Sequence, residues 1–196
     1  EKAVQTFGGI DIVINNASAI NFDDAISQDM KKYDLMHNIN LRGTFLVSKY
    51  TLPHLLKAKN PHILIMSPPI NLNPHWFEGK IAYTIAKYGM SMCVLGLSQE
   101  YRDAKIAVNA LWPKTAIATA AVQNVLAGDE GMKKCRTDEI MADSAYVILT
   151  NDSKELTGQF FIDEDVLRSV GVTDFTKYKA DHKVRDEDLM PDLYVE

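Results

Sequence analysis

Three short runs of branched apolar residues, separated by segments of helical length, constrain the fold of this chain more than any other feature. They are Ile10–Ile14 (IDIVI), Ile63–Met66 (ILIM) and Ile106–Leu111 (IAVNAL). Strands buried on both faces of a parallel sheet have this character, because the helices on each face leave little room for polar side chains. Gln159–Ile162 is a fourth candidate strand. The pattern predicts an open α/β sheet with right-handed crossovers.

The segments between these runs carry helix signals. Lys80–Tyr101 is the clearest helix, and Thr137–Leu149 is a second one with its first residue as the cap. A third helical region is expected to start at a Ser27 cap and to continue through Leu56. Asn40 is expected to lie at a break within that region.

Composition and charge exclude several classes of protein. The net charge of −5 argues against nucleic acid as the main partner, because phosphate binding requires a basic surface. The two cysteines and five histidines show no metal-ligand spacing, so no metal site is expected. No apolar run approaches the roughly 20 residues of a membrane-spanning helix.

The residues that directly follow the predicted strands lie at the edge of the sheet where open α/β folds bind ligands. They are Asn15, Asn16 and Ala17 after the first run, Ser67 after the second, and Pro113, Thr115, Ile117 and Thr119 after the third. Each group alone is a weak signal, since a serine after a strand is commonly a turn residue. Their occurrence together and in this order is much more specific.

Tyr83 and Lys87 are four residues apart on the predicted helix and therefore share one face. A free phenol has a pKa near 10 and is a poor base at neutral pH. An ammonium within about 4 Å could lower that pKa by up to roughly 3 units, less whatever desolvation of the lysine removes. Tyr83 is thus predicted to act as a general acid/base, with Ser67 donating a hydrogen bond to a substrate oxygen.

In these motifs the chain resembles the short-chain dehydrogenase/reductase family. The resemblance rests on Asn15-Asn16-Ala17, Asn40 in Asn-Leu-Arg-Gly, Ser67, the Tyr83/Lys87 pair and Pro113. It implies that Tyr83 is the acid/base, that Lys87 assists it and binds the nicotinamide ribose, that Ser67 orients the substrate and that Asn40 holds a relay water. It further implies cofactor contacts from Asn15, Ala17, Tyr83, Lys87, Pro113, Ile117 and Thr119. Two residues depart from the family pattern, because Ser18 and Lys114 stand where glycines are usual.

The resemblance also implies that residues 1–173 correspond to the C-terminal part of a Rossmann-like, doubly wound parallel sheet. From Asp174 onward, acidic and basic residues alternate without clear periodicity, so residues 174–196 are expected to form a solvated C-terminal tail or lid. The first strands and the Gly-rich phosphate loop of the family are absent from the sequence, which is expected to be a piece of a longer protein. Ile10–Asn15 should then be an edge strand, and this chain alone should be inactive and bind dinucleotide weakly.

The function implied is NAD(P)-dependent interconversion of a hydroxyl and a carbonyl, with NADP slightly favoured and a fatty or sterol-like substrate. The alternative is a non-catalytic module that binds dinucleotide or dimerises. Pro68–Pro74, with Trp76 and Phe77, forms either an apolar wall of the pocket or a rigid surface turn. The uncharged face of Tyr88–Gln99 either packs on the sheet or, by resemblance, forms a homo-oligomer contact. An intracellular location, in the peroxisome or mitochondrion, is implied by resemblance only.

Overall fold

The four predicted strands form one parallel sheet in the computed structural model, which describes residues 1–195. Their order across the sheet is β1-β2-β3-β4, and neighbouring strands are parallel throughout. The bounds are Ile12–Asn15 (β1), His62–Ile65 (β2), Ala107–Trp112 (β3) and Phe160–Ile162 (β4). Each lies within two residues of its predicted bounds, so the apolar runs located the sheet correctly.

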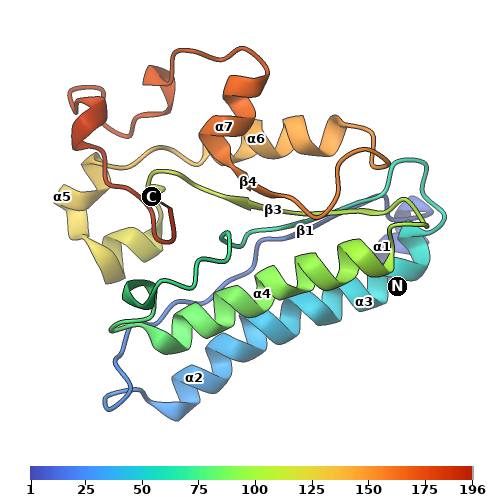
Figure 1. Ribbon diagram of the computed structural model, residues 1–196, viewed down its shortest axis with the longest axis horizontal. Helices are drawn as coiled ribbons and strands as arrows, with labels where there is room; N and C mark the ends of the chain where they lie inside the picture. Colours follow the sequence, from blue (N-terminus) through green and yellow to red (C-terminus); the bar gives the residue numbers. More distant parts are fainter. Residues whose placement is uncertain (196) are drawn as a thin grey trace.

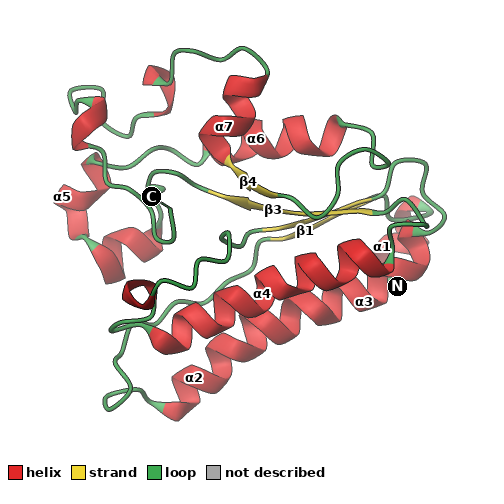
Figure 2. Ribbon diagram, in the orientation of Figure 1, coloured by secondary structure: helices red, strands yellow, loops and turns green. Residues whose placement is uncertain are grey.

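Helices cover both faces of the sheet (Figures 1 and 2). One face carries α3 and α4, and the other carries α6 and α7. The α-helices are α1 (Lys2–Phe7), α2 (Met30–His37), α3 (Gly43–Leu55), α4 (Ile81–Glu100), α5 (Gly128–Lys133), α6 (Glu139–Thr150) and α7 (Asp163–Ser169). Asn38–Arg42 (η1) and Val122–Leu126 (η3) are π-helical turns, and Pro74–Trp76 (η2), Thr176–Tyr178 (η4) and Asp186–Asp188 (η5) are 3₁₀ turns.

The hydrophobic core has two layers because side chains alternate across the sheet. In β2, Ile63 and Ile65 lie in the cluster formed with Leu55 of α3 and Val94 of α4. Leu64, between them, lies in the opposite cluster with residues of α6 and α7. All four residues of β2 are buried, including the polar His62. This burial on both faces explains why the predicted run Ile63–Met66 is the most uniformly apolar of the three.

Two predicted helix starts are wrong by one or two residues. Asp29, not Ser27, caps α2, and its carboxylate accepts hydrogen bonds from the main-chain N–H groups of Lys31 and Lys32. Asp138, not Thr137, occupies the cap position of α6. Capping residues of similar type stood close together in both segments, and only the backbone geometry distinguishes them.

The predicted break at Asn40 is confirmed. Regular α-helix stops at His37, and the π-helical turn η1 carries the chain through Asn40 into α3. The wider turn changes which side chains face the sheet, a feature that often accompanies functional residues.

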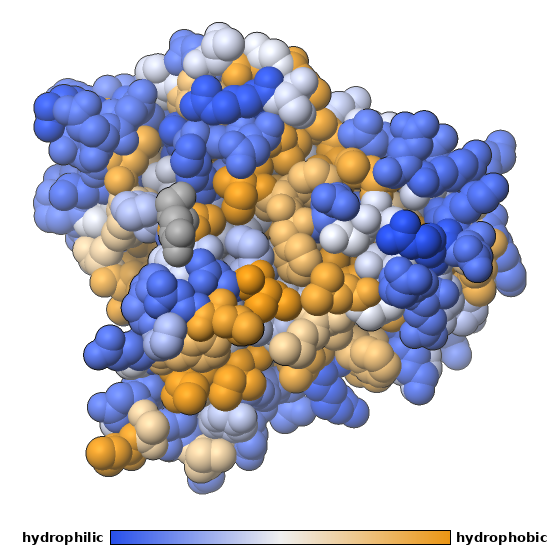
Figure 3. Space-filling view, viewed as in Figure 1, coloured by the Kyte–Doolittle hydropathy of each residue, from blue (hydrophilic) through white to orange (hydrophobic). Residues whose placement is uncertain are grey.

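The outward surface of α3 and α4 is partly apolar. On α4, Met90, Val94 and Leu97 are buried, whereas Met92 and Leu95 are about half exposed. The predicted packing on the sheet therefore accounts for only part of this uncharged stretch. Apolar side chains gather across the middle of the face seen in Figure 3, while the upper part of that face is mainly hydrophilic.

The C-terminal segment is not a solvated tail. Tyr178 and Tyr194 are buried, and the backbone of the segment bonds to the loop after β3 at Ala116 and Lys114. Its charged residues lie mostly at the surface, so charge patterning concealed the apolar contacts between them. The predicted domain boundary between residues 173 and 174 stays a prediction.

No helix within residues 1–195 combines the length and the apolar character that a bilayer crossing requires. Nor does this part of the chain group three or more histidine, cysteine, aspartate or glutamate side chains in a way that could hold a metal ion.

Candidate active site

Helix α4 places Tyr83 and Lys87 one turn apart on a buried face. The helix lies close to η1, since a Cβ on Gly89 would come within 2.8 Å of the Leu41 side chain. His37 of α2 fixes the start of the helix, with its Nε2 3.1 Å from the main-chain oxygen of Ala82. The helical pair is therefore held by packing rather than presented on a mobile surface.

The ammonium of Lys87 points to the end of β2. Its Nζ donates a hydrogen bond of 3.0 Å to the main-chain oxygen of Met66, the residue before Ser67. It also lies 5.0 Å from the ring centre of Trp112, at the end of β3. Two neighbouring strand ends thus meet at this lysine, as the topology of a parallel sheet requires.

Ser67 is fully buried, and its Oγ has no hydrogen-bond partner among residues 1–195. An unpaired buried hydroxyl costs free energy and calls for an explanation. Lys87 uses one of its three N–H donors in the bond to Met66. The two side chains therefore offer hydrogen-bonding capacity at one strand end, which suits a hydroxyl- or carbonyl-bearing ligand such as a ribose and a substrate.

A cavity of about 250 Å³ opens beside Tyr83. Of the group predicted after the third strand, Pro113, Ile117 and Thr119 line it, whereas Thr115 does not. The remaining walls are mainly apolar and include Ile20, Phe22, Trp112, Val122, Leu126 and the C-terminal residues Met190–Leu193. Phe22 packs edge-on against the Tyr83 ring, with centroids 4.9 Å apart.

The predicted lowering of the Tyr83 pKa is wrong for this structure. Burial raises the pKa of Tyr83 well above its usual value, and the acidic groups of Tyr194 and Asp192 raise it further. Lys87 does not offset these effects, and burial lowers its own pKa to about 8, so that it is still mostly an ammonium at neutral pH. Sequence spacing revealed the pair but not the desolvation that surrounds it.

Two of the three predicted residues on the β1 side, Asn40 and Asn15, make structural hydrogen bonds. The fully buried side chain of Asn40 accepts from the N–H of Ala19 at 2.7 Å and donates to its C=O at 2.9 Å. Asn15 donates to the hydroxyl of Ser48 at 3.2 Å, and Ala17 lies exposed in the loop after β1. Asn40 thus fixes the loop that leads to Ile20 and Phe22. Its relay water and the cofactor contacts of Asn15 and Ala17 stay predictions, since these side chains do not line the cavity.

The two departures from the family pattern impose no backbone strain. Among residues 1–195 only Lys105 and Tyr194 have a positive φ outside glycine, so Ser18 and Lys114 adopt ordinary conformations. A glycine is not needed at either position.

The expected apolar wall from Trp76 and Phe77 does not line the cavity beside Tyr83. Trp76 packs against Tyr194 with centroids 5.5 Å apart, and Phe77 packs against Tyr88 at 5.6 Å. Trp76 thus contacts the C-terminal segment directly, and Phe77 contacts it through Tyr88, which also packs against Tyr194. The predicted alternative of a turn is closer to the structure, although the turn is partly covered rather than free.

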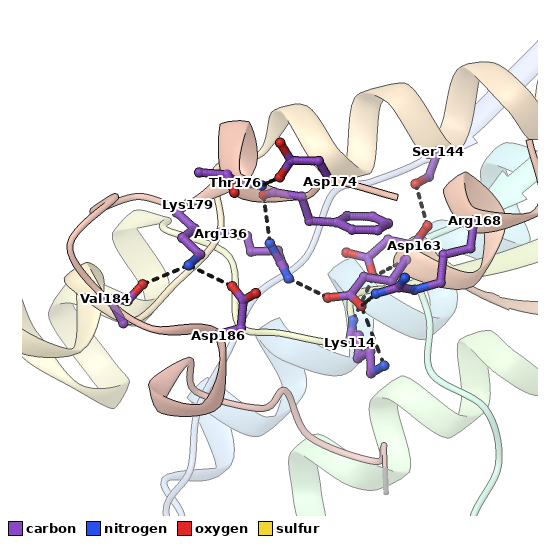
Figure 4. A network of polar contacts seen from close by, with 12 residues as sticks. Lys114, Arg136, Ser144, Asp163, Arg168, Asp174, Thr176, Lys179, Val184 and Asp186 are labelled. Atoms are coloured by element: carbon purple, nitrogen blue, oxygen red, sulfur yellow. Dashed lines mark hydrogen bonds and ion pairs between the residues drawn. The ribbon is translucent and has the colours of Figure 1, made fainter. Parts of the chain in front are cut away.

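A network of polar contacts, centred on the buried ion pair of Arg136 and Glu164, supports the loop after β3 (Figure 4). Arg136 donates from Nη2 to Glu164 at 2.6 Å, and both side chains are almost fully buried. The main chain of Arg136 bonds to Ala116 and Ala118, on either side of the cavity-lining Ile117. The ion pair therefore holds one wall of the cavity to the start of α7.

Asp163, the first residue of α7, fixes the same loop. Its Oδ1 accepts from the main-chain N–H of Lys114 at 2.9 Å and of Glu164 at 2.7 Å. Burial raises the pKa of this carboxyl to about 6. Its Oδ2 is buried without a hydrogen-bond partner among the described residues.

Sequence reasoning missed Arg136, Asp163, Glu164 and Asp192. The first three are ordinary charged residues in sequence and become notable only through burial. For Asp192 a signal existed, because Pro191, Leu193 and Tyr194 interrupt a charged stretch with a rigid and apolar motif. Such a motif indicates contact with the folded domain rather than a solvated tail.

Comparison with known proteins defines the class. Residues 1–130 match the family model described as short chain dehydrogenase. A solved short-chain dehydrogenase from Mycobacterium thermoresistibile is 49% identical, with a TM-score of 0.89, over the whole of this chain and 68% of that one. The chain therefore belongs to the short-chain dehydrogenase family, a class of oxidoreductases that use NAD or NADP.

Two individual relatives match this chain over its whole length. Hydroxysteroid dehydrogenase-like protein 2 of Danio rerio is 58% identical over the whole chain, which spans 46% of that relative. The solved structure of a candidate dehydrogenase from Xanthomonas campestris is 46% identical with a TM-score of 0.94, over the whole chain and 70% of that structure. The chain thus spans about half the length of the curated relatives it matches.

Proposed function

We propose that the protein catalyses NAD(P)-dependent interconversion of a hydroxyl and a carbonyl, with Tyr83 as the acid/base. One observation carries the proposal. Tyr83 faces a cavity shared with Pro113, Ile117 and Thr119, while Lys87, one turn along α4, reaches the strand end that holds the unpaired hydroxyl of Ser67.

Each residue of the site has a separate task. Ser67 donates a hydrogen bond to the substrate oxygen, where negative charge develops in the transition state. Tyr83 gives a proton to that oxygen during carbonyl reduction and accepts one during alcohol oxidation. Lys87 holds positive charge beside them and bonds the nicotinamide ribose. When bound, NAD(P) supplies or accepts the hydride.

The raised pKa of Tyr83 is compatible with this role. At neutral pH the phenol keeps its proton and can donate it to a forming alkoxide, which is a much stronger base. Accepting a proton in the reverse direction requires extra positive charge near the ring, which Lys87 and an oxidised nicotinamide provide.

The apolar walls of the cavity favour a lipid-like substrate. Ile20, Phe22, Ile117, Val122 and Leu126 contribute hydrocarbon surface around the few polar side chains of the lining, which are Tyr83, Thr119 and Asp192. Such a site binds by burial of apolar area and orients its ligand with a few polar groups. The relatives named hydroxysteroid dehydrogenase-like protein 2 are in keeping with a fatty or sterol-like substrate.

The exposed apolar strip on α3 and α4 supports a homo-oligomer. Phe45, Tyr50, Ile85, Met92 and Leu95 are each about half exposed or more. Contiguous apolar surface of this kind commonly marks an interface. The preference for NADP and the peroxisomal or mitochondrial location stay predictions from the family resemblance.

The decisive experiment is Tyr83→Phe in the full-length protein, assayed with NADPH and NADH on fatty and steroid ketones. General acid/base catalysis contributes about 10²–10⁴-fold, so we expect turnover to fall by at least about 100-fold. Dinucleotide affinity should change little, because the ring remains in place. Tyr146→Phe, at an exposed tyrosine of α6, is the matched control and should behave as wild type.

Unchanged turnover in Tyr83→Phe would refute the assignment of the acid/base. Tight dinucleotide binding by the wild type without turnover on any tested ketone or alcohol would favour the non-catalytic alternative.

A further inference from the structure

The C-terminal segment Met190–Tyr194 forms part of the wall of the cavity rather than a cover outside it. Met190, Pro191, Asp192 and Leu193 line the same cavity as Tyr83. Nothing in the acid/base mechanism above uses this segment, although it is far in sequence from every residue that does.

The first part of the segment is fixed to the loop after β3. The main-chain N–H of Ala116 donates to the oxygen of Met190 at 2.9 Å, and the N–H of Asp192 donates to the oxygen of Lys114 at 3.0 Å. These bonds form a short antiparallel bridge between Thr115 and Pro191. The backbone around Asp192 is therefore set by the strand end that also carries Pro113.

The second part is fixed to the catalytic helix. The Tyr194 hydroxyl lies 2.9 Å from Oγ1 of Thr84, the neighbour of Tyr83 on α4. The indole N–H of Trp112 donates to the oxygen of Leu193 at 2.8 Å, while its ring lies beside the ammonium of Lys87. Asp192 is thus held between two anchors, one on each side of the acid/base pair.

Tyr194 adopts an unfavourable backbone conformation in this arrangement. Its φ of 68° lies in the left-handed region, which tyrosine rarely adopts. Its ring is nevertheless buried against Trp76, Tyr88 and Trp112, with centroids 5.3–6.1 Å apart. Strain of this kind persists only where surrounding contacts over-determine the conformation, and it clusters at functional sites.

The carboxylate of Asp192 interacts electrostatically with both members of the catalytic pair, Tyr83 and Lys87. The Lys87 ammonium attracts it, and the carboxylate in turn opposes the lowering of the Lys87 pKa and adds to the raising of the Tyr83 pKa. The other titratable groups that interact with it are Asp163 at the start of α7, Cys135 after α5, and Tyr194 on its own segment. Lys87 is the one cation in this set.

We propose that Asp192 is a positioning residue of the active site, delivered by the segment Met190–Tyr194, whose carboxylate is the counter-charge of Lys87. The inference rests on the proposed dehydrogenase function and deepens it. The carboxylate stabilises the ammonium form of the lysine, while the hydrogen bond to Met66 directs that ammonium to the end of β2, from where Lys87 acts on Tyr83. Asp192 itself transfers no proton to the substrate.

The first test needs no turnover. In this chain labelled with ¹³C at the aspartate carboxyls, the Asp192 signal is assigned by its loss in Asp192→Asn, and its titration is followed by NMR. Burial and neighbouring groups place its pKa at about 7. Lys87→Met should raise that pKa by about one unit, the lower end of the range for a nearby opposite charge, because the ammonium of Lys87 lowers the pKa of the Asp192 carboxyl. A titration near the value of an exposed aspartate, or one indifferent to Lys87→Met, would overturn the proposal.

The second test uses the full-length enzyme. Asp192→Asn removes negative charge beside both Lys87 and Tyr83, so both limbs of the pH profile of kcat/KM should move to lower pH by about one unit. A purely structural role would lower activity or stability without moving the profile. Asp188→Asn, which removes an exposed carboxylate of η5, is the control and should leave the profile in place.

Tyr194→Phe separates anchoring from charge. It removes the hydroxyl bonded to Thr84 and keeps Asp192, so the limb set by Lys87 should stay in place, while the limb set by Tyr83 also responds to the loss of the Tyr194 hydroxyl. A shift of the Lys87 limb as large as that of Asp192→Asn would contradict the charge argument. Because the NMR titration is independent of catalysis, its outcome does not depend on the test of Tyr83→Phe.

Discussion

The two edges of the sheet differ in how completely this chain closes them. At the β4 edge, α7, the Arg136–Glu164 ion pair and the C-terminal segment enclose the strand ends. At the β1 edge, Ile12 and Ile14 are 45% and 48% exposed, and the loop that follows carries the exposed Ala17. The same fold is therefore buried and strongly cross-linked on one side and open on the other.

The proposed function assigns different tasks to the two sides. It places the groups that handle the substrate oxygen and the nicotinamide on the closed side and on helix α4, where desolvation strengthens electrostatic interactions. It places Asn15 and Ala17, which the family resemblance assigns to the adenosine part of the cofactor, on the open side.

The largest expected effect is on the closed side. Arg136→Met leaves Glu164 buried without its main partner, and breaking a buried pair in this way costs about 3–5 kcal/mol of unfolding free energy. Lys133→Met, which breaks a pair with Glu130 whose side chains are 52% and 85% exposed, should cost less than about 1 kcal/mol. Chemical denaturation of both variants measures the difference. Equal costs would mean that the closed side is not specially stabilised.

Core truncations compare the edge strand with a central strand. Ile65→Ala in β2 removes a fully buried side chain and should cost about 2–5 kcal/mol. Ile14→Ala in β1 removes a side chain already half in solvent and should cost about 1 kcal/mol or less. Thermal or urea unfolding of this chain distinguishes the two. A large cost for Ile14→Ala would show that the β1 edge is covered in solution.

The smallest expected effect is a pH dependence of the unfolding free energy that arises from Asp163 on the closed side. The pKa of Asp163 is raised to about 6 in the folded chain, so between about pH 4 and 6 the native state binds more protons than the unfolded state. Its contribution to stability is present at low pH and is lost as pH rises through 6. Asp163→Asn keeps an acceptor for the N–H groups of Lys114 and Glu164 and removes the titration.

The plot of unfolding free energy against pH should therefore be flatter in Asp163→Asn than in wild type between pH 4 and 6, by on the order of 1 kcal/mol. An unchanged slope would show that Asp163 is solvated and that the loop after β3 is more open than in the structure.

Much of the fold could be predicted because its signals are local. The apolar runs located all four strands, and Lys80–Tyr101 located α4 to within one residue at each end. The break at Asn40 was likewise detectable from the residue itself. The caps of α2 and α6 were misassigned, since several residues in each segment could accept the same hydrogen bonds.

Part of the site was also predictable, because residues at the carboxyl ends of parallel strands converge without further information. This rule brought Ser67 and Pro113 toward the helix that carries Tyr83 and Lys87. It could not give the protonation behaviour of Tyr83, because a pKa depends on every group that surrounds the phenol and on the water they exclude.

The sequence by itself determined the parallel sheet, the helix that bears the tyrosine and lysine, and the order of the polar groups at the strand ends. Each of these follows from periodicity or from neighbours within a few positions. Only the tertiary structure decided that Asp192 lines the same cavity as Tyr83, that Arg136 pairs with Glu164, and that burial raises the pKa of the Tyr83 phenol. These features depend on burial and on contacts between segments distant in the chain, and charge in a protein is governed by that three-dimensional surrounding.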